Sequence, residues 1–190
     1  MIALLVVICE VAFWVLLAAG LALRYVARKP RLGAAVLLCE PLLEVVLLVV
    51  TAIDLKNGSE PDWKHGLAAV YIGFTVGLGH HTVKKVDAWV AHRWFGGPPP
   101  VKPPKYGMAR AVHEWRTAAR WILAAVVAAG LLQAAIWYVG PGGEISSLQG
   151  WQQKMGLVVV VNLIIAGGYT VWPKRAPEGA VTEREPADRF

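Results

Sequence analysis

Five long apolar runs limit most strongly what this chain of 190 residues can fold into. Each run holds roughly 17 to 22 residues, enough for an α-helix rising about 1.5 Å per residue to cross about 30 Å of hydrocarbon. The mean hydropathy of +0.49 is also far above the norm for soluble proteins. We therefore predict an all-α integral membrane bundle of five transmembrane helices within residues 1–172. The runs cover residues 2–23, 33–53, 66–84, 119–139 and 156–172.

Lysine and arginine are distributed very unevenly over the connections between these runs. Sixteen of the 19 follow the first, third or fifth run, and three lie in the other two connections. Because cytoplasmic loops carry the excess of positive charge, we expect the N-terminus outside and the C-terminus in the cytoplasm of a bacterial plasma membrane. Orientation thus accounts for the net charge of +6, and no nucleic-acid partner is expected.

The connection between the third and fourth runs is predicted to be the main element outside the membrane. Its centre, residues 96–107, is too rich in proline for a helix and should form a stiff, polyproline-like spacer between two flanking helices. The second of these helices mixes arginine with tryptophan, as expected for an ordinary basic helix end or for contact with an anionic inner leaflet. Residues 173–190 are charged and predicted to be a disordered tail.

The second run carries polar residues that lipid would not tolerate. At about 100° per residue they fall on one narrow stripe of the helix, which must therefore face other helices or a wet cavity. Pro41 lies inside the run and frees the carbonyl of Leu37, which predicts a kink or an extra acceptor there. The stripe consists of Glu40, Glu44, Thr51 and Asp54.

The third run has a corresponding stripe that begins with small residues and continues with titratable ones. Two glycines four residues apart permit close backbone approach, so Gly73 and Gly77 predict a helix contact, and this face is also where a homodimer is expected. At steps of three or four residues, the stripe continues through His80, Lys84 and Asp87.

Counting residues from the ends of each run places the polar residues in layers. Glu40 and His80 fall about 12 Å and 9 Å above the inner boundary, which predicts a contact between them. Glu44 and Glu10 fall near the middle of the bilayer and are predicted to share a proton. Gln133 and Asn162 fall at a similar level and are expected mainly to join helices by hydrogen bonds.

A neutral carboxylic acid within the bilayer suits general acid catalysis or proton relay. Our leading hypothesis is an enzyme acting on a lipid or isoprenoid-like substrate, with Glu44 as acid, Glu10 as its partner, and Glu40 with His80 nearer the inner side. The second hypothesis is proton-coupled or cation transport along a column from Asp54 to Lys84 and Asp87. The third is a non-catalytic partner or assembly protein.

No cofactor is predicted. Haem would need facing histidines on two spans, and a di-metal bundle would need Glu-x-x-His repeats, neither of which the sequence contains. An irregular metal site remains open, built from Glu10, Glu40, Glu44 and His80. The sequence also lacks the P-loop, GxGxxG, HExxH and GxSxG motifs, so nucleotide-driven work and serine-hydrolase chemistry are unsupported.

Three stretches together resemble a known group of proteins. They are TAIDLKNG, HGLAAVYIGFTVGLGHH and GGPPPVKPPKYG, and the likeness extends over roughly residues 1–107. In combination they are similar to small, uncharacterised multi-pass membrane proteins of Gram-positive bacteria. The resemblance implies location and topology and carries no activity, so the expected partners are membrane lipids and a lipid-like small molecule.

Overall fold

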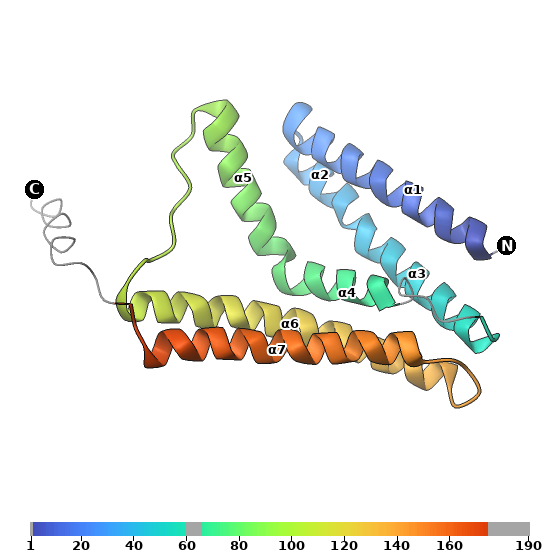
Figure 1. The fold of residues 1–190 in the computed structure, drawn as a ribbon. Coiled ribbons are helices and arrows are strands. Elements are labelled where there is room, and N and C mark those ends of the chain that lie inside the picture. The colour runs from blue at the N-terminus through green and yellow to red at the C-terminus, as the bar shows by residue number, and fades with distance from the viewer. Residues whose placement is uncertain (1, 60–65, 175–190) are drawn as a thin grey trace, which may run out of the picture.

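A computed structural model describes residues 2–59 and 66–174, except for the side chains of residues 2–7, 9 and 10. Every regular element within these ranges is helical, which confirms the all-α class for this part of the chain (Figure 1). The predicted disordered tail lies almost entirely outside the described residues. The elements are α1 (Ile2–Leu21), η1 (Ala22–Val26), α2 (Pro30–Leu37), α3 (Cys39–Lys56), α4 (Leu67–Phe74), η3 (Thr75–Gly79), α5 (His80–Phe95), α6 (Gly107–Val139) and α7 (Ser146–Val171).

Three of the helices are long and apolar enough to cross a membrane. They are Pro30–Lys56, which joins α2 to α3, then α6 and α7. Residues 11–26 are the part of the first apolar helix whose side chains are fully described, and the helix formed by α4, η3 and α5 is not among the three. Within the described residues the structure thus supports the second, fourth and fifth predicted spans by length and composition.

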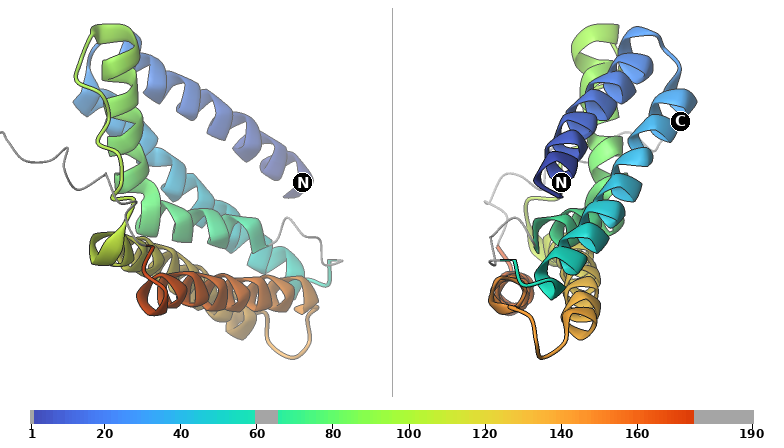
Figure 2. Two further views of the ribbon diagram at one scale, coloured as in Figure 1. Left: turned by 60° about the vertical axis from the view of Figure 1, so that its left-hand side comes forward. Right: turned by 90° about the vertical axis from the view of Figure 1, so that its right-hand side faces the viewer.

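The two longest helices form an antiparallel pair against which α3 and α4 pack. α6 and α7 lie side by side, and α4 packs along α6 (Figures 1 and 2). Their shared core also includes α3, and its most deeply buried side chains are Leu55, Leu132 and Leu148. The predicted basic helix before the fourth span is simply the start of α6, whose 33 residues rise about 50 Å.

A second antiparallel pair joins α1 to α2 through a short turn at which Arg28 has a positive φ of 55°. The two helices approach each other closely where glycines face one another. A Cβ on Gly33 would lie only 2.7 Å from the carbonyl oxygen of Gly20, which is too close for any other residue. The helix then breaks at Leu38 between α2 and α3. This break comes three residues before Pro41, whose missing N–H leaves the carbonyl of Leu37 without its helical hydrogen bond.

The third predicted span is bent where a straight helix was expected. The π-helical segment η3 separates α4 from α5, and α5 turns away from α6 (Figure 1). A π-helical turn takes one residue more than an α-helical turn, so residues beyond it are rotated relative to a regular helical wheel. The predicted stripe is therefore wrong beyond the glycines: Gly73 and Gly77 face α6, whereas His80 and Lys84 are exposed.

Candidate buried carboxylate site

Glu40 and Glu44 lie one turn apart on α3 and both point into the protein. Their exposed fractions are 4% and 9%, and that of Thr51 is 8%. These three are the buried polar or charged residues among those described, so the predicted stripe does face the interior. Asp54, the outermost member of the stripe, is half-buried near the end of α3.

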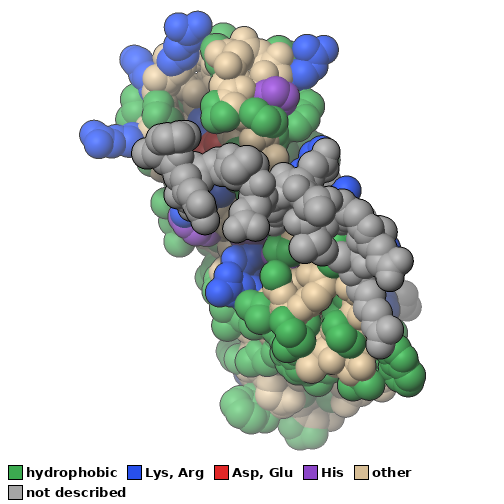
Figure 3. Space-filling view, turned by 90° about the vertical axis from the view of Figure 1, so that its left-hand side faces the viewer, with side chains coloured by type: hydrophobic (Ala, Val, Ile, Leu, Met, Phe, Trp, Pro, Cys, Tyr) green, Lys and Arg blue, Asp and Glu red, His purple; other side chains and the backbone are tan. Residues whose placement is uncertain are grey.

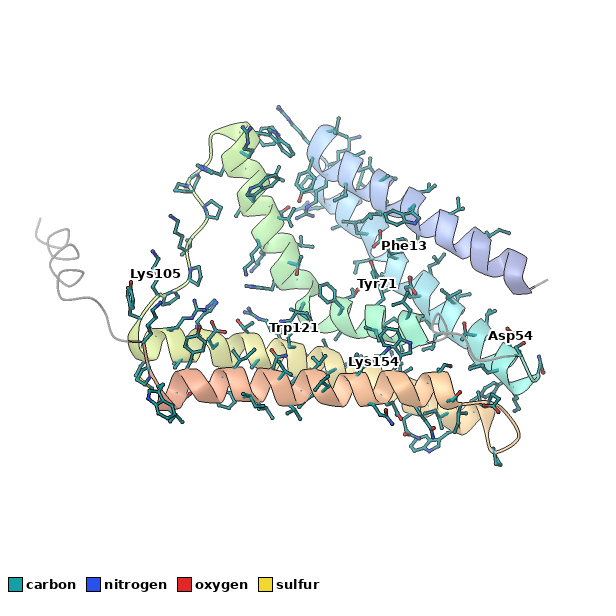
Figure 4. The ribbon with its side chains drawn as sticks, viewed as in Figure 1. Phe13, Asp54, Tyr71, Lys105, Trp121 and Lys154 are labelled. Carbon is teal, nitrogen blue, oxygen red and sulfur yellow. The ribbon has the colours of Figure 1, made fainter. Side chains whose placement is uncertain are left out.

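Tyr71 of α4 is the partner that the structure gives to Glu40. Its hydroxyl donates a 2.7 Å hydrogen bond to Oε2 of Glu40. The Tyr71 ring in turn meets the edge of the Phe13 ring of α1, with centroids 5.3 Å apart (Figure 4). Side chains from three helices thus meet around one carboxyl group. We call Glu40, Glu44 and Tyr71 the acid cluster.

The other oxygen of Glu40 has no hydrogen-bond partner among the described residues. Oε1 is buried, with less than 1 Å² exposed. Buried polar atoms are nearly always paired, because leaving one unpaired costs about 1 to 3 kcal/mol. Glu40 therefore offers a free oxygen inside the helix bundle, beside a phenol that can donate or pass on a proton.

The two predicted carboxyl pairings have different outcomes. The predicted contact between Glu40 and His80 is wrong. Tyr71 occupies one oxygen of Glu40, the other has no partner in the described part of the chain, and His80 is exposed. The bend at η3 explains the error. The pairing of Glu44 with Glu10 stays a prediction, since the Glu10 side chain is outside the described residues.

Sequence reasoning missed Tyr71, although a signal was present. Tyr71 is a phenol inside the third apolar run, at the sixth residue of the run. A buried tyrosine usually finds a hydrogen-bond partner for its hydroxyl, so it could have been counted among the polar residues of that run.

Asp87 is held by residues at the end of the first apolar helix. The Arg24 guanidinium bonds both carboxylate oxygens, with Nε 2.8 Å from Oδ1, and the Tyr25 hydroxyl donates to Oδ1 at 2.8 Å. Hydrogen bonds from Arg24, helped by that from Tyr25, hold the pKa of Asp87 below its usual range. From sequence, Arg24 was interpreted only as a marker of orientation. The structure makes it the link between η1 and α5.

The remaining predicted polar residues have separate roles. Gln152 of α7 donates a 3.0 Å hydrogen bond to the side-chain oxygen of Gln133 of α6, so Gln133 joins two helices as expected. Asn162 instead donates to the carbonyl oxygen of Val158 in its own helix, at 2.8 Å. The expected helix-joining role of Asn162 is therefore not seen in its described contacts.

The described residues do not gather into a metal-binding group. No cluster of three or more His, Cys, Asp or Glu side chains that could hold an ion occurs among them. The irregular metal site suggested by the sequence needs His80 beside the glutamates, and His80 is exposed on the far side of the bend.

Comparison with known proteins gives a relative that matches nearly the whole chain. The sequence is 32% identical over 183 residues to an uncharacterized membrane protein of Bacillus subtilis (strain 168), YmcC, and the match covers 94% of this chain and 96% of the relative. No family model matches the chain, and no solved structure matches it.

Proposed function

Because this chain belongs to the family of the Bacillus subtilis membrane protein YmcC, we propose that it is a multi-pass plasma-membrane protein whose acid cluster acts on a lipid. It crosses the membrane five times, with the N-terminus outside and the C-terminus in the cytoplasm. Its substrate is a lipid or isoprenoid-like molecule, and Glu40, Glu44 and Tyr71 supply acid/base chemistry.

Two observations support five crossings. α1 and η1 form one continuous helix over residues 2–26, and α4, η3 and α5 form another over residues 67–95. Both are long enough to cross about 30 Å, although the second does so with a bend. Together with the three apolar helices they make five, and the excess of lysine and arginine alternates between the connections as a five-span topology requires.

The unpaired oxygen of Glu40 is the observation that carries the proposed chemistry. Helix packing alone would be served by a glutamine, which costs less to bury than a glutamate. A glutamate with one free oxygen, a second carboxyl group one turn away and a phenol in contact can instead hold a proton and deliver it to an apolar substrate. Tyr71 of α4 links this carboxyl group of α3 to the Phe13 ring of α1.

The test is turnover by conservative variants. The purified protein in detergent is incubated with a total lipid extract of a Gram-positive bacterium, and the lipids are compared by mass spectrometry. Glu44→Gln should abolish any conversion and leave the protein folded, and Glu40→Gln should do the same. The matched control is Glu144→Gln at an exposed position. Full conversion by Glu44→Gln would refute the proposal.

A second candidate is passage of protons or cations, which the outward continuation of the stripe favours. Thr51 is buried and Asp54 half-buried beyond Glu44 on the same helix. Liposomes containing the protein would then show a flux that follows a pH gradient, and no lipid would be altered.

The remaining alternative is a non-catalytic role in assembly with a partner. A variant with both Glu40→Gln and Glu44→Gln would then keep its biological activity, and changes within residues 96–118 should impair it.

A further inference from the structure

The bend at η3 opens an angle between α5 and α6 on the side predicted to be cytoplasmic. Up to Gly77 the two chain segments are in backbone contact, since a Cβ there would lie 2.5 Å from the carbonyl oxygen of Arg120. Beyond Gly77, α5 leads away from α6 and the connector returns to the start of α6 (Figure 1). Side chains just past the contact therefore face one another across the angle.

Those side chains are basic. His80 and His81 begin α5 directly after the contact of Gly77 with Arg120, and Lys85 follows one turn later on the same helix. His113 and Arg120 lie on α6, and both act electrostatically on His81. We call the five residues the basic corner. They are His80, His81, Lys85, His113 and Arg120.

The acidic residues of this region are already neutralised. Residues 80–120 contain eight lysines and arginines but only Asp87 and Glu114 as acids. Asp87 pairs with Arg24 of η1, and Glu114 pairs with Arg110 at 2.6 Å. Among the described residues, neither acid is thus free to balance the basic corner. Figure 3, which faces this end of the molecule, shows Lys and Arg side chains of the described residues in blue.

Apolar surface adjoins the basic corner on its membrane side. The Phe74 and Trp121 rings meet edge to face with centroids 5.9 Å apart, and Trp121 directly follows Arg120 (Figure 4). Val76 and Phe74 remain 56% and 38% exposed. Charged groups beside exposed apolar and aromatic side chains at the inner boundary match the two ends of a lipid.

From this arrangement we infer that the basic corner binds the phosphate headgroup of an anionic membrane lipid, whose acyl chains lie along the Phe74, Val76 and Trp121 surface. The site is separate from the acid cluster and does not depend on its chemistry. A lipid is favoured over free phosphate because the cations lie where the predicted spans end, beside exposed apolar surface that phosphate alone would not contact.

The experiment measures retention of phosphatidylglycerol by the full-length protein in detergent, by native mass spectrometry, with phosphatidylcholine as the headgroup control. The variant Lys85→Gln with Arg120→Gln should weaken phosphatidylglycerol binding about 25-fold, at roughly five-fold for each cation near an anionic headgroup. Added salt should weaken the wild-type binding in the same direction. Inorganic phosphate should not displace the lipid.

Two further variants make the result specific. Lys29→Gln with Arg31→Gln removes the same charge from exposed positions at the turn between α1 and α2 and should leave binding unchanged. Arg120→Lys keeps the charge and should keep most of the affinity. Three results would each overturn the inference. They are an equal loss of phosphatidylglycerol binding in the Lys29/Arg31 variant, retention of phosphatidylcholine equal to that of phosphatidylglycerol, and displacement of the lipid by inorganic phosphate.

Discussion

At the scale of single residues, the central fact is one hydrogen bond inside the bundle. Tyr71 satisfies one oxygen of Glu40, and the other has no partner among the side chains that the structure describes. Hydrogen bonds to a carboxyl group contribute about 1.5 to 3 kcal/mol, and losing the donor leaves a second buried oxygen without a partner. The stability of the bundle should therefore depend on the Tyr71 hydroxyl.

We expect Tyr71→Phe to lower the free energy of unfolding by about 1 to 3 kcal/mol. The ring and its contact with Phe13 are kept, so only the hydroxyl is tested. Denaturant unfolding in detergent, followed by circular dichroism, measures the change. Tyr138→Phe serves as the control, because Tyr138 is half-exposed, at 50%. Equal effects of the two changes would mean that the bond to Glu40 adds nothing.

The link between Arg24 and Asp87 predicts a pH dependence. The pKa of Asp87 is lower in the folded protein than in the unfolded chain, so its contribution to stability is present above the unfolded value of about 3.9. That contribution is lost as the pH falls through the folded pKa. Asp87→Asn should thus be less stable than wild type at pH 7, with the difference shrinking toward zero at low pH. A difference that persists unchanged in acid would contradict this cause.

Residue partners were the least predictable feature from sequence. Burial of Glu40 and Glu44 followed from the stripe on α3, because lipid excludes carboxylates. Their partners did not follow, since depth counting treats each helix as straight. The partner of Glu40 is Tyr71, before the bend, whereas His80, after it, was expected. Likewise Arg24 reaches Asp87 only because α5 turns toward η1.

At the scale of elements, the contact of α4 and η3 with α6 depends on two glycines, Gly73 of α4 and Gly77 of η3. A Cβ on Gly73 would collide with the backbone of α6 and lie 2.9 Å from the Cβ of Ala128, and a Cβ on Gly77 would lie 2.8 Å from the nitrogen of Ala124. The glycine face predicted from sequence is therefore a helix contact, formed within the chain. Homodimerisation stays a prediction, and a dimer would have to use another face.

Gly73→Ala should destabilise the protein by about 1 to 3 kcal/mol, because backbone atoms of α6 cannot yield to the added methyl group. Gly130→Ala is the matched control: it lies in α6, where a Cβ would meet nothing within 4 Å, and should be neutral or stabilise by up to about 1 kcal/mol. Thermal unfolding of the two variants in the same detergent gives the comparison. A stable Gly73→Ala protein would show that the two helices can separate.

Some features of the helices can be predicted from the local sequence, and others cannot. The apolar runs, the break near Pro41 and the glycine contact all follow from local chemistry, and the structure contains each. The π-helical segments η1 and η3 do not, because insertion of one residue into a turn leaves hydropathy and helix propensity unchanged. One such segment was enough to change which side chains of the third span meet.

At the scale of the whole molecule, two antiparallel pairs are joined through α4. The pair of α1 with α2 and α3 meets the pair of α6 with α7 where α3 and α4 contribute to a common core (Figure 2). The ends predicted to be cytoplasmic are those of η1, α5 and α7, together with the start of α6. This arrangement gives the proposed topology a direct test.

Single cysteines should report opposite sides of the membrane. Two variants are made in a chain whose Cys9 and Cys39 are replaced by serine. Glu144→Cys places a cysteine in the connection between α6 and α7, and Lys102→Cys places one in the connector after α5. A membrane-impermeant maleimide added to intact cells should label Glu144→Cys and should label Lys102→Cys only after the cells are opened. The reverse pattern would place the N-terminus in the cytoplasm.

The glycine contact between α4 and α6 also bears on how the protein is made. The helix that contains α4 is bent, and it is not among those apolar enough by themselves to span a membrane. Its closest packing partner, around Ala124 and Ala128, follows the proline-rich connector in the sequence and is therefore synthesised after it. The third helix therefore gains its partner late, and its release from the insertion machinery into lipid should be coupled to the arrival of the fourth.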